Sequence, residues 1–134
     1  MNINDVNVDM LNEGCGYVNF KASLGGVQIG LLQTGRPSHL DRCNVLAVDV
    51  TEHHQRKGVG ALLYRHLKKY LEDIGCYTVT ACVEGSGTVQ LHERTFGPGN
   101  TKYMLGDHEL CYEDAVHHMD VDFGRLRLES KLYP

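Results

Sequence analysis

Residues 55–60 read Gln-Arg-Lys-Gly-Val-Gly, and this stretch decides the fold because it joins an apolar run, Val45 to Val50, to an amphipathic segment that begins at about Ala61. The run is short and rich in valine, which predicts a central strand that is apolar on both faces. A glycine-bearing loop between a strand and a helix leaves unpaired backbone N–H groups at the positive end of the helix dipole. The stretch therefore predicts an anion-binding loop.

The segment after the loop has the period of a helix and is followed by a second strand. Its apolar residues recur at spacings of three and four: Val59, Leu62, Leu63, Leu67, Tyr70, Leu71 and Ile74. Gly75 supplies a stop, and Cys76 to Val83 alternates in the manner of a strand. Strand, crossover helix and strand form a βαβ unit, so we expect two parallel strands joined by a right-handed connection.

The rest of the chain predicts a single α+β domain over residues 1–134, built on a mixed, twisted sheet of about six strands with helices packed on it. Tyr17 to Ala22 and Val27 to Gln33 form an antiparallel pair across a glycine turn. The remaining expected elements are a weak first strand at 6–11, a short helix at 88–96 and a closing strand near 126–132. Residues 103–105 and 110–118 stay ambiguous between strand and helix.

Composition excludes several classes of protein. The chain has a formal charge of −4, which argues against a general nucleic-acid-binding protein because such affinity depends on clustered Lys and Arg. No apolar run approaches the ~20 residues that a bilayer span needs, so we expect no membrane partner. The five cysteines form no C-x-x-C pair and are odd in number, as in a reduced cytoplasmic protein, and we expect all of them to be buried. The eight histidines lack metal-ligand spacing, so we expect no metal.

The order of apolar strand, Q-x-x-G-x-G loop, amphipathic helix and strand resembles the acetyl-coenzyme A (acetyl-CoA) binding core of the GNAT N-acetyltransferase superfamily. Gln55, Gly58 and Gly60 match all three positions of the family signature, Q/R-x-x-G-x-G/A. The stretch from Val89 to Phe96 resembles the family's cofactor-side helix, which usually ends L-Y-E-K-L-G-F. The resemblance implies acetyl-CoA as co-substrate.

Two departures distinguish this chain from the usual family pattern. His92 stands where the family has a tyrosine that often protonates the departing thiolate. Only a few residues separate Leu11 from Tyr17, where most members have one or two helices that wall the acceptor site. The chain thus resembles a short member with a reduced N-terminal region.

The resemblance implies a set of cofactor-binding residues. Backbone groups of Val48 and Val50 would hold the pantetheine arm, and the loop would hold the pyrophosphate. The loop set comprises Gln55, Arg56, Lys57, Gly58, Val59, Gly60 and Ala61. Glycines allow backbone amides to approach the phosphates, and the two cations add attraction.

The catalytic residues are less well defined by the sequence. His92 is a candidate proton donor to the thiolate, and the alternative is a partly exposed helix histidine with no chemical role. For the base that deprotonates the amine, Asp49, Glu84 and His54 are candidates, and either carboxylate could instead be a solvated strand-end group. Asp49 should point to the opposite face from Val48 and Val50.

The implied function is transfer of an acetyl group from acetyl-CoA to a primary amine of a small molecule or protein by direct attack. An alternative of another class is a catalytically degenerate member that acts as a CoA-binding, protein-binding or inhibitory module. The shortened front and His92 favour that alternative. The oligomeric state is left open between a monomer and a homodimer.

Overall fold

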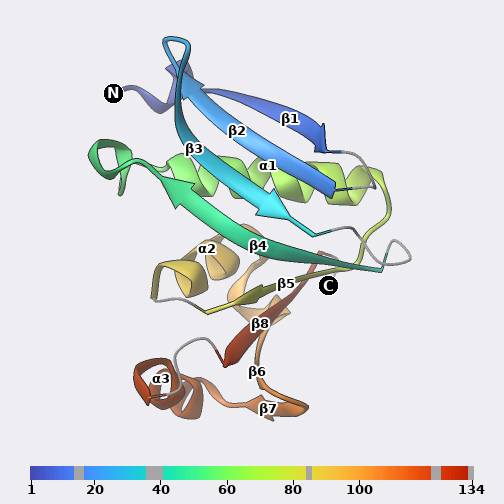
Figure 1. The fold of residues 1–134 in the computed structure, drawn as a ribbon. Helices are drawn as coiled ribbons and strands as arrows, with labels where there is room; N and C mark the ends of the chain where they lie inside the picture. Colours follow the sequence, from blue (N-terminus) through green and yellow to red (C-terminus); the bar gives the residue numbers. More distant parts are fainter. Residues whose placement is uncertain (14–16, 36–40, 84–85, 122–124, 133–134) are drawn as a thin grey trace.

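The computed structural model describes residues 1–13, 17–35, 41–83, 86–121 and 125–132. Within these residues, eight strands form one twisted sheet in the order β1-β2-β3-β4-β5-β8-β6-β7 (Figure 1). The strands are β1 (Asn7–Glu13), β2 (Tyr17–Leu24), β3 (Val27–Thr34), β4 (Arg42–Val50), β5 (Thr78–Cys82), β6 (Thr101–Leu105), β7 (His108–Leu110) and β8 (Leu126–Lys131). The helices are α1 (Val59–Asp73), α2 (Ser86–Phe96) and α3 (Tyr112–Val121), with short 3-10 turns at Ile3–Asp5, Glu52–His54 and Pro98–Asn100.

Strand directions match the sequence-based fold. Strands β1 to β4 pair antiparallel in succession, and β4 pairs parallel with β5 across the α1 crossover. Strand β8 pairs antiparallel with both β5 and β6. The α+β class, the antiparallel N-terminal strands and the central βαβ unit are therefore confirmed.

The number of strands was underestimated. The structure has eight strands in its described part where the sequence predicted about six. The additional strands β6 and β7 form a short hairpin, and most of the ambiguous segment at 110–118 belongs to α3. Strands this short carry too few alternating positions for a sequence pattern to identify them.

The described helices cover one face of the sheet. Helix α1 packs on β2, β3 and β4, whereas α2 packs on β6 and β8 and also contacts α1. Val89 of α2 and Ala115 of α3 belong to one apolar cluster with Leu128 of β8, which places α3 on the same face. The opposite face carries alternate strand residues and has no helix over it among the described residues (Figure 1).

A β-bulge interrupts β4 next to the crossover. Gln33 pairs with Ala47 and Thr34 pairs with Val45, so Leu46 is an extra residue on β4. Such a bulge shifts the alternation of side chains and increases the local twist. It explains why Cys43 and Val45 face the helices before the bulge, whereas even-numbered residues do so after it.

The bulge marks the point where β4 and β5 separate. Their parallel ladder runs from Arg42–Thr78 to Val45–Ala81 and ends there. From Leu46 to Val50, β4 is paired with β3 alone in the described part of the chain. The two central strands therefore diverge and leave one edge of β4 open.

Two further observations concern the cysteines and the helices. Cys43 and Cys76 are buried, but Cys82 and Cys111 are exposed, so the expectation that every cysteine is buried was wrong for these two. Cys15 lies outside the described residues. Among the described helices, none is long and apolar enough to cross a membrane.

Candidate active site

A cleft of about 630 Å³ opens where β4 and β5 diverge. Its walls come from β4, from the loop and first turns of α1, from the end of β5 and from one face of α2. The lining residues are Val45 to Val48, Val50, His54 to Arg56, Gly58 to Ala61, Tyr64, Ala81, Cys82, Gly87, Thr88, Gln90, Leu91 and Arg94. The volume lies in the range of small-molecule sites.

The open edge of β4 presents backbone hydrogen-bonding groups to this cleft. The amide of Thr51 donates to Ile29 of β3 at 2.9 Å, which fixes the alternation along the strand. Residues 47 and 49 therefore bond to β3, and the N–H and C=O groups of Val48 and Val50 point away from it. The side-chain Nε2 of Gln55 donates to the Val50 carbonyl at 3.0 Å, which agrees with this direction.

The loop before α1 has two residues in the left-handed region. Arg56 has φ 62°, and Gly58 has φ 89° at the N-cap of α1. A residue other than glycine rarely adopts positive φ, and such residues occur often at ligand sites. The conformation turns the chain so that the amino end of α1 faces the cleft.

The amino end of α1 has no side-chain cap. Gly58 has no side-chain donor or acceptor, and the first helical hydrogen bond links the Leu62 amide to the Gly58 carbonyl at 3.0 Å. The preceding amides, from Val59 to Ala61, lie outside the helical ladder. Together with the helix dipole, they form a favourable environment for an anion.

Helix α2 forms the opposite wall of the cleft through residues spaced as one helix face: Gly87, Gln90, Leu91 and Arg94. A Cβ on Gly60 would meet the Leu91 side chain at 3.4 Å, an ordinary contact, so α1 and α2 pack against each other at this wall of the cleft. Arg56 and Arg94 both line the cleft and supply positive charge. These α2 residues are not among the site residues predicted from the sequence, although their three- and four-residue spacing was a usable signal.

The acetyltransferase (GNAT) family model matches residues 4–97, which is more than half of the chain. The chain belongs to the GNAT acetyltransferase family. No curated protein sequence matches it.

Solved GNAT structures share the fold. An IAA acetyltransferase from Bacillus cereus superposes with a TM-score of 0.65 at 14% identity, over 94% of this chain and 99% of that one. The ribosomal-protein-S18-alanine N-acetyltransferase from Escherichia coli gives 0.63 at 22% identity, over 90% and 72%. N-acetylglutamate synthase from Neisseria gonorrhoeae, complexed with coenzyme A and N-acetyl-glutamate, gives 0.61 at 16% identity. That match covers 87% of this chain, which spans only 26% of the synthase.

Most of the cofactor residues expected from the GNAT resemblance come together in the cleft. Those that line it are Val48, Val50, Gln55, Arg56, Gly58, Val59, Gly60 and Ala61. Lys57 is exposed and is not among the lining residues. His54 lines the cleft, and its Nδ1 lies 2.7 Å from the Thr51 hydroxyl.

His92, which stands at the family's tyrosine position, lies in the core beneath the cleft. It has no exposed surface and does not line the cleft. Burial lowers its pKa from 6.5 to about 4, so the imidazole is neutral at pH 7. We therefore correct the prediction that His92 donates a proton to the thiolate, because a neutral, enclosed imidazole cannot act as the expected imidazolium. The alternative expectation, a partly exposed histidine, is also wrong.

The hydrogen bonds around His92 form a directed chain. The Thr101 hydroxyl donates to the Gly97 carbonyl at 3.2 Å, so in its 3.0 Å contact with Ser130 the donor must be Ser130. The Ser130 oxygen then accepts from His92 Nδ1 at 2.8 Å, and the bare Nε2 accepts from the Tyr64 hydroxyl at 3.1 Å. Every donor in the chain is used.

These hydrogen bonds tie four elements together below the cleft, the fourth being β6 through Thr101. They link Tyr64 of α1 to His92 of α2 and to Ser130 of β8. Tyr64 lines the floor of the cleft, although it has no exposed surface, and burial raises the pKa of its phenol. The side chain that replaces the family tyrosine thus serves as a structural anchor for the floor.

Only one of the two candidate carboxylates, Asp49, lies among the described residues. Asp49 is exposed, while its neighbours Val48 and Val50 are half-buried and pack against the core. Asp49 therefore points to the face opposite the helices, as predicted, and is not part of the cleft lining. Glu84 lies outside the described residues.

Proposed function

We propose that this protein transfers the acetyl group of acetyl-CoA to a primary amine of a small molecule or protein. The observation that carries the proposal is the convergence of the unpaired β4 edge and the uncapped amino end of α1 in one cleft. The β4 edge suits the extended, amide-containing pantetheine arm, and the amino end of α1 suits the pyrophosphate. Membership of the GNAT family and the coenzyme A bound in the Neisseria synthase structure support the same donor.

The described residues suit the parts of acetyl-CoA in a definite arrangement. The N–H and C=O groups of Val48 would pair with the pantetheine arm as an added strand would, whereas the Val50 carbonyl already accepts from Gln55. The amides from Val59 to Ala61 would hold the pyrophosphate. Arg56 and Arg94 would add charge-assisted contacts on opposite walls.

Transfer requires a neutral amine placed against the thioester carbonyl. Holding both reactants in one cleft removes the entropic cost of their encounter. We propose Asp49 as the base, acting through water, because its side chain lies on the uncovered face of the sheet from which an amine can approach. Glu84 follows β5 in the sequence and remains the second candidate.

A second candidate function is a CoA-binding module without turnover. The burial of His92 favours it, because this residue cannot supply the proton that the family tyrosine often provides. If the protein is an acetyltransferase, the thiolate obtains its proton from water in the cleft. The acetyltransferase and the binding module predict the same cofactor affinity and differ in turnover.

Calorimetric titration with acetyl-CoA and with desulfo-CoA, together with a thiol-release assay over a panel of amines, distinguishes these functions. The acetyltransferase function predicts binding of both ligands and thiol release with at least one class of amine. Binding without thiol release on any amine would favour the binding module. Absence of binding would overturn both.

A further inference from the structure

The uncovered face of the sheet carries a cationic patch beside the mouth of the cleft. On β5, β6, β8 and the first half of β4, the charged residues that point to this face are Arg42, Lys102, Arg127, Glu129 and Lys131. The patch thus has four cations and one carboxylate in a chain whose formal charge is −4. Glu109 follows on the outermost strand, β7. A local excess of positive charge in an acidic protein favours an anionic ligand.

Arg127 stands next to the cleft. It pairs across β5 and β8 with Cys82, which is exposed and lines the cleft. Directly opposed residues in an antiparallel pair have Cβ atoms about 5 Å apart on the same face. The guanidinium of Arg127 is therefore one strand away from the point where an amine entering from this face would reach the cleft.

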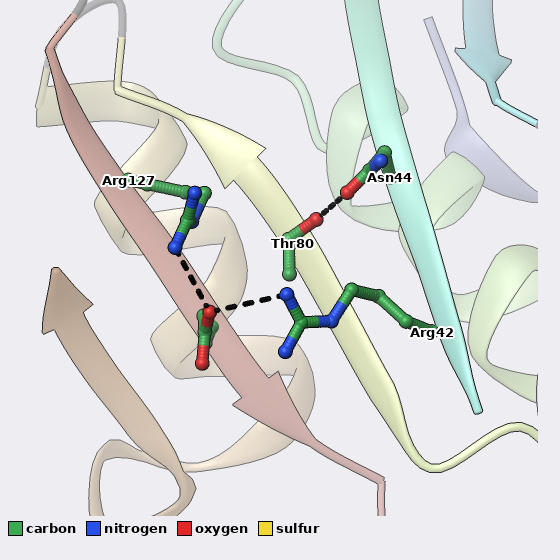
Figure 2. A network of polar contacts seen from close by, with 5 residues as sticks. Arg42, Asn44, Thr80 and Arg127 are labelled. Atoms are coloured by element: carbon green, nitrogen blue, oxygen red, sulfur yellow. Dashed lines mark hydrogen bonds and ion pairs between the residues drawn. The ribbon is translucent and has the colours of Figure 1, made fainter. Parts of the chain in front are cut away.

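Arg127 and Arg42 share one carboxylate. Nη2 of Arg127 lies 3.2 Å from Oε1 of Glu129, and Nη1 of Arg42 lies 3.5 Å from the same oxygen. Glu129 thus lies between the two guanidinium groups. Figure 2 shows Arg127 and Arg42, with the Asn44–Thr80 hydrogen bond beside them. Arg127, Arg42 and Glu129 together carry a net charge of +1, and Lys102, which pairs directly opposite Glu129, adds a further cation, so this group attracts an anion.

The Nε–H of Arg127 is a donor without a partner. It is buried and has no hydrogen-bond partner among the described residues, although the side chain as a whole is 40% exposed. Buried donors in native proteins are nearly always paired. Nη2 already contacts Glu129, so the exposed remainder of the guanidinium is the part that can form a charge-assisted contact with a carboxylate.

We propose that the acceptor is a small amine that also carries a carboxylate, bound by Arg127 with Arg42 as the second cation. The carboxylate lies on the uncovered face, and the amine enters the cleft between Leu46 and Cys82, which line it from that side. The short separation between Arg127 and the mouth suits a molecule of amino-acid size. This inference rests on the proposed acetyl transfer.

The first test compares matched amines, each offered as the free carboxylate and as its uncharged amide. Glycine with glycinamide, and phenylalanine with phenylalaninamide, are suitable pairs. The proposal predicts that kcat/KM for the carboxylate, calculated on the neutral amine present because the amide is the weaker base, exceeds that for the amide by about tenfold or more, as expected for a charge-assisted pair. Equal rates for the two members of each pair, or a preference for the amide, would overturn it.

Variants assign the preference to this patch. Arg127→Gln should remove the carboxylate preference, and Arg42→Gln should weaken it. Glu129→Gln should strengthen it, because the net charge of the group then rises from +1 to +2. Lys21→Gln is the matched control, since it removes one cation from the same face on β2 and should leave the preference unchanged. Arg127→Gln with an unaltered preference contradicts the assignment.

A binding measurement keeps the proposal separate from turnover. The ¹⁵N-detected Nε–Hε signal of Arg127 should shift on titration with N-acetylglycine in the presence of saturating CoA, and should not shift with N-acetylglycinamide. If acetyl-CoA does not bind, the acetyl-transfer function fails, and glycine is titrated into the free protein instead. In either case, a signal that responds equally to the acid and the amide, or to neither, overturns the carboxylate site.

Discussion

A series of substitutions at Gly60 tests the phosphate site by separating side-chain size from charge. Alanine adds one Cβ, which would meet Leu91 at 3.4 Å, an ordinary contact. It should leave the fold intact and raise helix stability by up to ~1 kcal/mol. Glutamine adds bulk without charge, and glutamate adds the same bulk with one negative charge. A negative charge at a helix amino end favours the helix, so Gly60→Glu should remain folded.

The expected effect of the charge follows from Coulomb's law. A unit charge about 6 Å from one phosphate charge, at an effective dielectric constant of about 20, costs roughly 3 kcal/mol, or about a hundredfold in Kd. Calorimetric titration of acetyl-CoA should therefore show alanine close to wild type and glutamate about a hundredfold weaker than glutamine. The difference should shrink as salt is added. Equal affinities for the glutamine and glutamate variants would refute a pyrophosphate at this loop.

Three further predictions concern stability and turnover. The pKa of His92 is about 4 in the folded protein and 6.5 for an unperturbed histidine, so between these values the unfolded state binds one more proton. The free energy of unfolding should therefore fall by about 1.4 kcal/mol per pH unit as the pH drops through this window. His92→Gln should flatten that slope in urea titrations, and an unchanged slope would contradict the neutral, buried imidazole. Gly58→Ala should lower the free energy of unfolding by about 1 kcal/mol in the same assay, because φ at this residue is 89°. Gly87→Ala should not lower it, because the added Cβ meets no atom within 4 Å. Asp49→Asn should lower kcat/KM about a hundredfold without changing the Kd of acetyl-CoA, and an effect equal to that of Asp9→Asn would remove Asp49 as the base.

The sequence was sufficient for the fold and the donor side of the cleft because those parts depend on local patterns. The helix period from Val59 to Ile74 and the signature loop lie in contiguous segments, and the structure places α1 at Val59–Asp73. The direction of Asp49 followed from alternation after Val48. Each of these depends on a few neighbouring residues, which a sequence shows directly.

The parts that were missed depend on contacts between distant segments. A sequence pattern shows the chemical type of His92 but not its burial, because its hydrogen-bond partners Tyr64 and Ser130 are 28 and 38 residues away. The bulge at Leu46 is a mismatch between two strands and has no local signal. The charges around Glu129 likewise come from β4 and β8, which only the folded sheet brings together.

The central claim is that acetyl-CoA lies along the open edge of β4. Amide hydrogen exchange at Val48 tests it most directly, with Ala47 as an internal reference because its amide bonds to β3. Saturation with desulfo-CoA should slow exchange at Val48 by about tenfold or more, as a new hydrogen bond protects its N–H, and should leave Ala47 unchanged. Exchange at Val48 that stays the same in the saturated protein would contradict the account.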